Sequence, residues 1–190
     1  VNELWDGSSW TEVADLNTAR YILGVAGTST AAVAFGGVGG TGLSETWDGS
    51  SWTEGPDLNT ARSHLYGVGT STAALGFGGN PVLTATEAYD GTSWSAKPSL
   101  ATGRHNLSGA GTTTAGLAFG GEATGPVLAI TEEWNGTAWT EGNDLNTARQ
   151  ELCAAGTTTA GLAFAGDGGD YSAATEEWNA PSEATETIST

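Results

Sequence analysis

The sequence predicts an all-β fold built from four copies of one small antiparallel sheet. Tryptophans recur at a step of 42 to 45 residues, at Trp10, Trp52, Trp94 and Trp139. The arginines keep the same step, at Arg20, Arg62, Arg104 and Arg149. Glycine, with 30 of the 190 residues, and abundant Thr, Ser and Ala favour turns and closely packed strands over helices. A repeat of about 40–50 residues marked by aromatics and glycines is typical of a propeller or a solenoid.

The second unit shows how the elements of one repeat follow one another. Residues 51–54 are rich in strand-forming side chains and end at a Gly-Pro pair, which stops the strand. Residues 57–62 then form a connector that contains the repeated arginine. A strand of small residues is expected at 64–69, and the Gly-Thr-Ser-Thr segment at 69–72 turns the chain back.

The rest of the unit adds two more strands. Residues 73–77 are almost all apolar, which indicates a strand buried on both faces. The Gly78-Gly79 pair ends it, and a variable loop leads to a strand at 86–89. An Asp-Gly step then returns the chain to the next Trp strand, so that each repeat is expected to be a four-stranded antiparallel meander, the unit of a propeller blade.

The turns before the Trp strands carry a strong hairpin signal. Asp-Gly and Asn-Gly pairs readily adopt the positive φ angles that tight hairpins need. The sequence does not decide between a two-residue and a four-residue loop. The pairs are Asp6-Gly7, Asp48-Gly49, Asp90-Gly91 and Asn135-Gly136.

The repeat resembles a kelch repeat, which has a glycine pair after an apolar strand, then an aromatic, then a Trp. The fourth unit departs from this pattern, with Ala165 in place of the first glycine and no Trp after Trp178. The Thr/Ala/Gly-rich sequence of the repeats is also similar to that of kelch-like repeats in marine bacteriophage proteins of the virion or tail-fibre type. This second resemblance implies a structural role. The matching segments are Phe35-Gly36-Gly37 with Trp47 and Trp52, Phe77-Gly78-Gly79 with Tyr89 and Trp94, and Phe119-Gly120-Gly121 with Trp134 and Trp139.

The number of strands does not fit one closed ring. A strand ending in an aromatic occurs five times, whereas the Trp strand after the hairpin occurs four times. The strand at residues 9–12 can complete the blade that ends at Trp178, but residues 2–5 then compete with residues 175–178 for one place. Three arrangements stay open: a four-bladed ring with a loose end, half of an eight-bladed ring made by two chains, or part of a longer array. The approximate units are 10–51, 52–93, 94–138 and 139–179, with 1–9 a partial repeat and 180–190 a polar tail or linker.

Composition excludes several classes of function. The chain holds 22 acidic and 5 basic residues, for a net charge of −17, and this leaves no basic patch for phosphates. Nucleic acid and anionic membrane surfaces are therefore not expected partners. No apolar run approaches the roughly 20 residues that a membrane span needs. The absence of methionine and a start inside a repeat motif lead us to expect a piece of a longer protein.

The repeated arginines and tryptophans are interpreted as structural, the arginines tying the connectors and the tryptophans packing between blades. Binding is expected where the repeats differ, in loops 38–43, 80–84, 122–130 and 167–173, which open on the same face as the connectors. Asp167 and Asp170 fall short of the roughly six to eight oxygens that calcium prefers, so no metal site is predicted. The candidate ligand-binding residues are Asn80, Glu122, Asp167, Asp170 and Tyr171.

No catalytic residues and no cofactor are predicted. His64 and His105 lie in neighbouring repeats but form no recognisable nucleophile–base set. The preferred hypothesis is a non-enzymatic binding or structural propeller at a virion surface or outside the cell. It would contact other protein chains, its own copies included, and a host-surface glycan. A secreted lectin-like propeller is the alternative, and an oxidase- or sialidase-type enzyme is disfavoured. The ligand, the blade number and the source stay open.

Overall fold

A computed structural model describes residues 1–38 and 42–179, so the expected tail at 180–190 lies outside the described residues. Every regular element in this part of the chain is a β-strand. No helix long and apolar enough to cross a membrane occurs in the described residues. The chain begins with a two-stranded hairpin of β1 (Asn2–Trp5) and β2 (Trp10–Val13).

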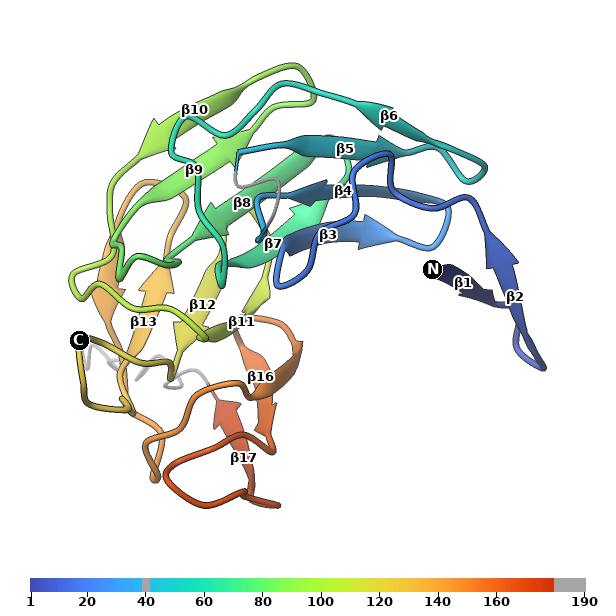
Figure 1. Cartoon of the computed structure of the whole chain (residues 1–190). Helices are drawn as coiled ribbons and strands as arrows, with labels where there is room; N and C mark the ends of the chain where they lie inside the picture. The colour runs from blue at the N-terminus through green and yellow to red at the C-terminus, as the bar shows by residue number, and fades with distance from the viewer. Residues whose placement is uncertain (39–41, 180–190) are drawn as a thin grey trace, which may run out of the picture.

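Four antiparallel sheets follow the hairpin and form the blades of a four-bladed β-propeller (Figure 1), which confirms the predicted fold class. Within each blade the strands pair in chain order. Blade 1 is β3 (Gly24–Thr28), β4 (Ala31–Phe35), β5 (Ser44–Trp47) and β6 (Trp52–Glu54). Blade 2 is β7 (Tyr66–Thr70), β8 (Ala73–Phe77), β9 (Thr86–Tyr89) and β10 (Trp94–Lys97). Blade 3 is β11 (Ser108–Gly111), β12 (Gly116–Phe119), β13 (Thr131–Trp134) and β14 (Trp139–Glu141). Blade 4 is β15 (Cys153–Gly156), β16 (Ala160–Phe164) and β17 (Thr175–Asn179).

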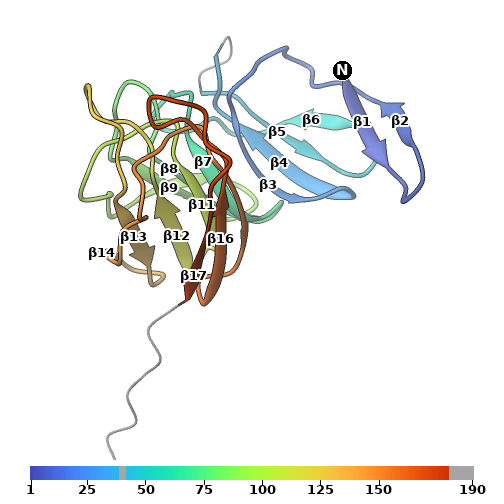
Figure 2. The same cartoon turned by 90° about the horizontal axis from the view of Figure 1, so that it is seen from below.

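The first strands of the four blades surround a common axis. β3, β7, β11 and β15 together line a space of about 420 Å³ along it. β3 contacts β7, β7 contacts β11 and β11 contacts β15. The array starts and ends with incomplete sheets, since blade 4 has three strands and the β1–β2 hairpin stands apart from it in both views (Figures 1 and 2).

The hairpin turns have four-residue loops closed by an aspartate, or by Asn135 in blade 3. In blade 1, Trp47 pairs with Trp52, and the loop between them begins at Asp48. Asp48 Oδ1 accepts hydrogen bonds at 2.8 Å from the backbone amides of Ser50 and Ser51. Hydrogen bonds from Ser50 and Ser51 lower the pKa of the exposed Asp48 carboxyl to about 2. The question that the sequence left open is thus settled in favour of four residues.

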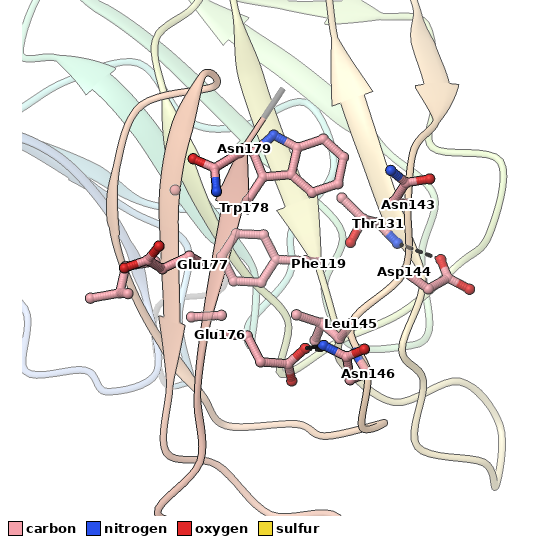
Figure 3. Close-up of a pocket in the computed structure, with 13 residues that line it drawn as sticks. Phe119, Thr131, Asn143, Asp144, Leu145, Asn146, Glu176, Glu177, Trp178 and Asn179 are labelled. Carbon is pink, nitrogen blue, oxygen red and sulfur yellow. Dashed lines mark hydrogen bonds between the residues drawn. The ribbon is translucent and has the colours of Figure 1, made fainter. Parts of the chain in front are cut away.

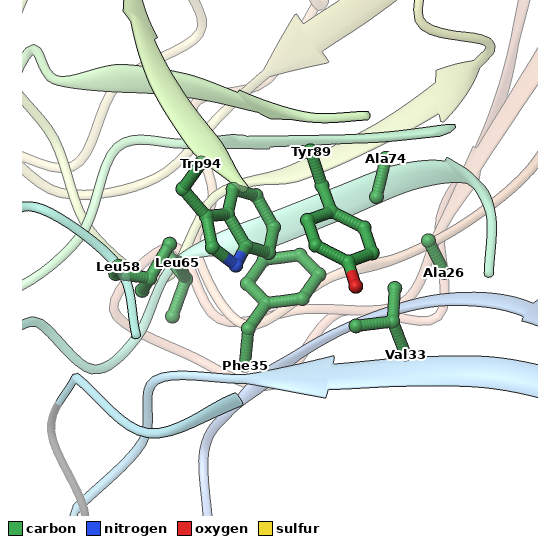
Figure 4. Packing of buried hydrophobic residues seen from close by; sticks show 8 residues of the cluster. All are labelled: Ala26, Val33, Phe35, Leu58, Leu65, Ala74, Tyr89 and Trp94. Carbon is green, nitrogen blue, oxygen red and sulfur yellow. The ribbon is translucent and has the colours of Figure 1, made fainter. Parts of the chain in front are cut away.

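The core consists of separate clusters between neighbouring blades. Phe35 at the end of β4 points away from its own sheet and packs against Trp94 of blade 2, with ring centroids 4.7 Å apart (Figure 4). A glycine on the first strand of blade 2 makes room for this ring, because a Cβ on Gly67 would lie 2.6 Å from Phe35 Cζ. Each blade therefore supplies one side of the core of the next, as in other repeat architectures.

The glycine pair after the second strand is where the next connector passes. Gly78 has φ +67°, and a Cβ there would lie 2.7 Å from the Arg104 carbonyl oxygen. Gly79 N–H donates to that same oxygen at 2.9 Å. In blade 4 the equivalent residue is Ala165, with φ +60°, and no described connector passes over it. The departure from the glycine pair thus coincides with the end of the described array.

Candidate functional site

Four buried ion pairs fix the connectors to the blades. Each repeated arginine pairs with a glutamate on the third strand of the blade that its connector enters. The same glutamate accepts hydrogen bonds from the connector backbone, as Glu87 Oε2 does from Asn59 N–H at 2.7 Å. The pairs are Arg20–Glu45 at 3.1 Å, Arg62–Glu87, Arg104–Glu132 at 3.0 Å and Arg149–Glu176 at 2.8 Å.

These pairs are enclosed by their own blades. Burial lowers the pKa of the Arg62 guanidinium, against the opposing effect of Glu87. Burial alone would raise the pKa of the Glu87 carboxyl, but hydrogen bonds from Arg62 and Asn59 outweigh it and hold the pKa below its usual value. Because all four arginine side chains are fully buried, they are not available to a ligand. The arrangement holds connectors in place.

A ring of left-handed residues surrounds the axis on the connector face. It consists of the residues two positions after each arginine: Ile22, His64, Asn106 and Glu151, all with φ between 52° and 55°. His64 N–H donates to the Ile22 carbonyl at 3.0 Å, and Asn106 N–H donates to the His64 carbonyl at 3.1 Å. Glu151 N–H continues the series to Asn106 at 2.9 Å. The backbone of this axial ring therefore links all four blades.

The side chains of the axial ring differ between blades: Ile22 is apolar, whereas His64, Asn106 and Glu151 are polar. They line a cavity of about 390 Å³ together with Leu65, Leu107 and Leu152. His64 and His105 lie edge to face with centroids 5.8 Å apart, and His64 Nδ1 lies 2.9 Å from Ser63 Oγ. Burial, then the proximity of His105, lowers the pKa of His64. Asn106 Nδ2 donates to Gln150 Oε1 at 3.0 Å.

Three of the predicted binding residues lie beside this ring. The residue after each glycine pair forms a β-bridge to the residue after each arginine, so Asn80 pairs with Ser63, Glu122 with His105 and Asp167 with Gln150. The Glu122 carboxylate lies 3.8 Å from His105 Nε2. These variable positions therefore meet on one face around the axis.

The other two predicted residues lie on the same blade-4 loop as Asp167. Asp170 and Tyr171 are exposed on the blade-4 loop, and Tyr171 is 97% accessible. Asp167 forms a bridge to Tyr171, and its Oδ1 accepts from Gly169 N–H at 2.7 Å, so the carboxylate caps its own turn. Within residues 1–38 and 42–179, no group of three or more acidic, histidine or cysteine side chains could hold a metal ion.

Sequence reasoning missed the axial ring as a unit. The two histidines lie one position apart in the repeat, and neither Ile22 nor Glu151 carries a glycine or asparagine signal for positive φ. A comparison of the two positions after each arginine would have found the set, because both vary in chemistry where three of the four preceding connector segments are identical.

A second candidate site is an aromatic cavity of about 140 Å³ between blades 3 and 4 (Figure 3). We call it the blade-4 socket; its defining side chains are Phe119, Thr131 and Trp178. Figure 3 shows Phe119 and Trp178 close together, with Thr131 opposite them. The connector segment 143–146 and the third strand of blade 4 complete the walls.

The other blades show what occupies the equivalent place. In blade 3, Trp139 on the fourth strand packs on Phe77 of blade 2 at 5.1 Å and on Trp134 of its own blade at 5.4 Å. Trp139 Nε1 donates to Thr86 Oγ1 at 3.0 Å. Phe119, Trp178 and Thr131 are the repeat equivalents of Phe77, Trp134 and Thr86. The socket therefore has the three contacts of a fourth-strand Trp without that strand.

Comparison with known proteins adds no assignment. No family model matches the chain, and no curated protein matches it. The structure shows a four-bladed β-propeller, and the resemblance to kelch repeats rests on the sequence pattern.

Proposed function

We propose that this chain is a non-enzymatic binding and structural module that assembles with other protein chains through its open blade edges. The observation that carries the proposal is the blade-4 socket, which borders an unpaired edge of β17 in the described structure. An edge strand presents unpaired N–H and C=O groups to any strand that can approach it. A preformed aromatic cavity beside such an edge favours protein association by strand addition.

The charge of the molecule and the exposed tryptophans of the hairpin support the same function. Trp5 and Trp10 are 48% and 65% accessible, which is unusual for the largest apolar side chain. With a net charge of −17, repulsion between chains keeps such a surface from associating unspecifically and favours contacts of defined geometry. We infer a surface role outside the cell or on a virion, as a tail fibre or surface decoration, from the likeness of the repeats to kelch-like phage proteins.

A lectin-like function is the second candidate, and the axial cavity favours it. Asn106 and Glu151 bring an amide and a carboxylate to its lining, and His64 adds an imidazole ring. Polar groups beside the apolar side chains of Ile22 and the three leucines suit the hydroxyl groups and the C–H face of a sugar. Screening a glycan array with the full chain and with an Asn106→Ala variant tests it: binding that the variant loses supports the function, and absence of binding removes it.

The assembly function is tested by the solution mass of the full chain. Light scattering over a concentration series from micromolar to millimolar is expected to show a mass above that of one chain at the upper end. A mass of one 19.1 kDa chain throughout contradicts self-assembly. Assembly with a different protein would then need to be shown by capture on this chain, with a loss on blocking the β17 edge.

A further inference from the structure

The chain carries both the vacant socket and a strand of the type that fills it. β2 has the same Trp-Thr-Glu sequence as the fourth strands β6 and β14. Its Trp10 is the most exposed of the tryptophans at this repeat position. Trp94 and Trp139 are covered by the Phe side chains of preceding blades, whereas no such Phe precedes Trp10 in the described structure.

β2 is paired in the same way as a fourth strand. Trp10 pairs with Trp5 of β1, just as Trp139 pairs with Trp134 of β13. The edge of β2 that would meet β17 is therefore the edge that β1 occupies. Placing Trp10 in the socket with the correct face inward requires β2 to exchange β1 for β17.

We propose that β2 of one copy leaves β1 and completes blade 4 of a second copy, with Trp10 seated in the blade-4 socket. This inference rests on the proposed assembly function and names its partner as a second copy of this chain. Trp10 then packs on Phe119 and Trp178 of the acceptor, and its indole N–H donates to Thr131 Oγ1.

The described structure favours a second copy over closure within one chain. β2 pairs only with β1 and β17 only with β16 in the described residues, so the two strands lie in separate sheets. The β1–β2 hairpin and blade 4 flank the open side of the array (Figure 1). Asn17 fixes the connector after β2 to Glu45 of blade 1 in the same way as Asn59 fixes the next connector to Glu87, so β2 keeps the connector geometry of a fourth strand when it completes a blade of another copy.

The exchange keeps the number of backbone hydrogen bonds nearly constant. β2 gives up its four-residue register with β1 and gains an equivalent register with β17, whose Thr-Glu-Glu-Trp sequence matches the third strands of the other blades. The exchange therefore differs from the starting state in two ways: the Trp10 side chain becomes buried, and its indole N–H gains a hydrogen bond. Buried Trp side chains at the centre of an interface are the commonest source of binding energy.

Val25 and Ala165 limit the contact between the two copies mainly to the exchanged strand β2. Gly67, on the first strand of blade 2, leaves room for Phe35, but Val25 stands at the equivalent place in blade 1 and is exposed. At the other end, Ala165 replaces the glycine over which the next connector would pass. Blade 1 of the donor therefore packs less closely on blade 4 of the acceptor than the other blades pack on one another, and the exchanged strand carries most of the association.

The first test compares the full chain with two hairpin variants by light scattering across the same concentration series. Trp10→Ala is expected to weaken association by about 30-fold or more, the effect of losing an interfacial Trp. Trp5→Ala is the matched control, since it alters the neighbouring exposed Trp on the displaced strand. Its association is expected to equal or exceed that of the unaltered chain. Equal weakening by both variants overturns the exchange.

The second test isolates the socket. A fluorescently labelled peptide of residues 8–13 is titrated into the full-length Trp10→Ala chain, whose socket is intact, with the peptide carrying Ala at position 10 as control. Saturable binding of the Trp peptide alone, reduced by Thr131→Val in the acceptor, supports the proposal. Equal binding of both peptides, or of neither, overturns it. If the unaltered chain still assembles, the proposed function survives that failure. A single-chain mass throughout contradicts the exchange and self-assembly, and leaves only assembly with a different protein.

Discussion

Replacing Gly78 by Ala should destabilise the junction between blades 2 and 3 strongly. At φ +67°, the new side chain adopts a left-handed conformation that costs about 1–2 kcal/mol. Its Cβ would also lie 2.7 Å from the Arg104 carbonyl oxygen and 2.8 Å from Leu107 Cδ2. Both neighbours belong to blade 3, so the two blades must move apart.

The expected size follows from three contributions. Overpacking of this kind costs about 1–3 kcal/mol. Weakening the 2.9 Å hydrogen bond from Gly79 N–H to the Arg104 carbonyl adds about 0.5–1.5 kcal/mol. The lower entropy of the unfolded Ala chain returns about 0.4–1 kcal/mol. Together with the cost of positive φ, the net loss in the free energy of unfolding is about 1.5–6 kcal/mol.

Urea unfolding followed by far-ultraviolet circular dichroism measures this loss, and Ala165→Gly is the matched control. Ala165 has nearly the same φ but no connector of a following blade beside it, so relief of strain and gain of chain entropy nearly cancel. We expect Ala165→Gly to change stability by less than about 1 kcal/mol. A Gly78→Ala loss as small as that would refute the assigned role of the glycine pair.

Three other predictions concern the hairpin turns, the buried arginine–glutamate pairs and the two ends of the array of blades. Asp48→Ala should lower the urea midpoint, whereas Asp48→Asn should not, because Asn135 closes the blade-3 turn with the same amide contacts. The Asp48 pKa of about 2 means that its contribution is complete above pH 4 and fades toward pH 2, a loss that the Asn variant should not show in acid titrations. Glu87→Gln should cost about 3–5 kcal/mol in urea unfolding, because it leaves a buried guanidinium without its counter-charge. Because the pKa of Glu87 is lowered in the folded state, this carboxylate stabilises the fold fully above its ordinary pKa, and its contribution is lost as the pH falls through the folded-state pKa. If Glu87→Gln had the same dependence of unfolding free energy on acid pH as the unaltered chain, this account would be contradicted. Val25→Gly combined with Ala165→Gly should tighten association in sedimentation experiments, and a weaker complex would show that these residues do not obstruct stacking.

The strands were predictable because each depends on its own short sequence. The apolar run of β8, the Asp-Gly turns and the glycine pairs each carry a local conformational preference, and repetition reinforces it. The sequence also predicted one more third strand than fourth strands. The structure resolves this count as a separate β1–β2 hairpin and a three-stranded blade 4.

The sites were less predictable because they form between units. Loop variability led to Asn80, Glu122 and Asp167, but their cluster with the axial ring depends on how the blades turn about the axis. The blade-4 socket depends on contacts between successive blades, which the Trp spacing alone does not reveal. The packing of Trp139 on Phe77 in the structure shows that Phe119, the equivalent of Phe77, lacks the fourth-strand Trp in the described residues.

The most direct measurement of the open edge is hydrogen exchange at β17, with β13 as the internal reference. β13 is paired on both sides, between β12 and β14, whereas β17 pairs only with β16 in the described structure. We predict that the outward amides of Thr175–Asn179 exchange quickly at low protein concentration and become protected as concentration rises, while β13 stays protected throughout. Protection of β17 equal to that of β13 at the lowest concentration would show that blade 4 is already complete within one chain, and would contradict the account.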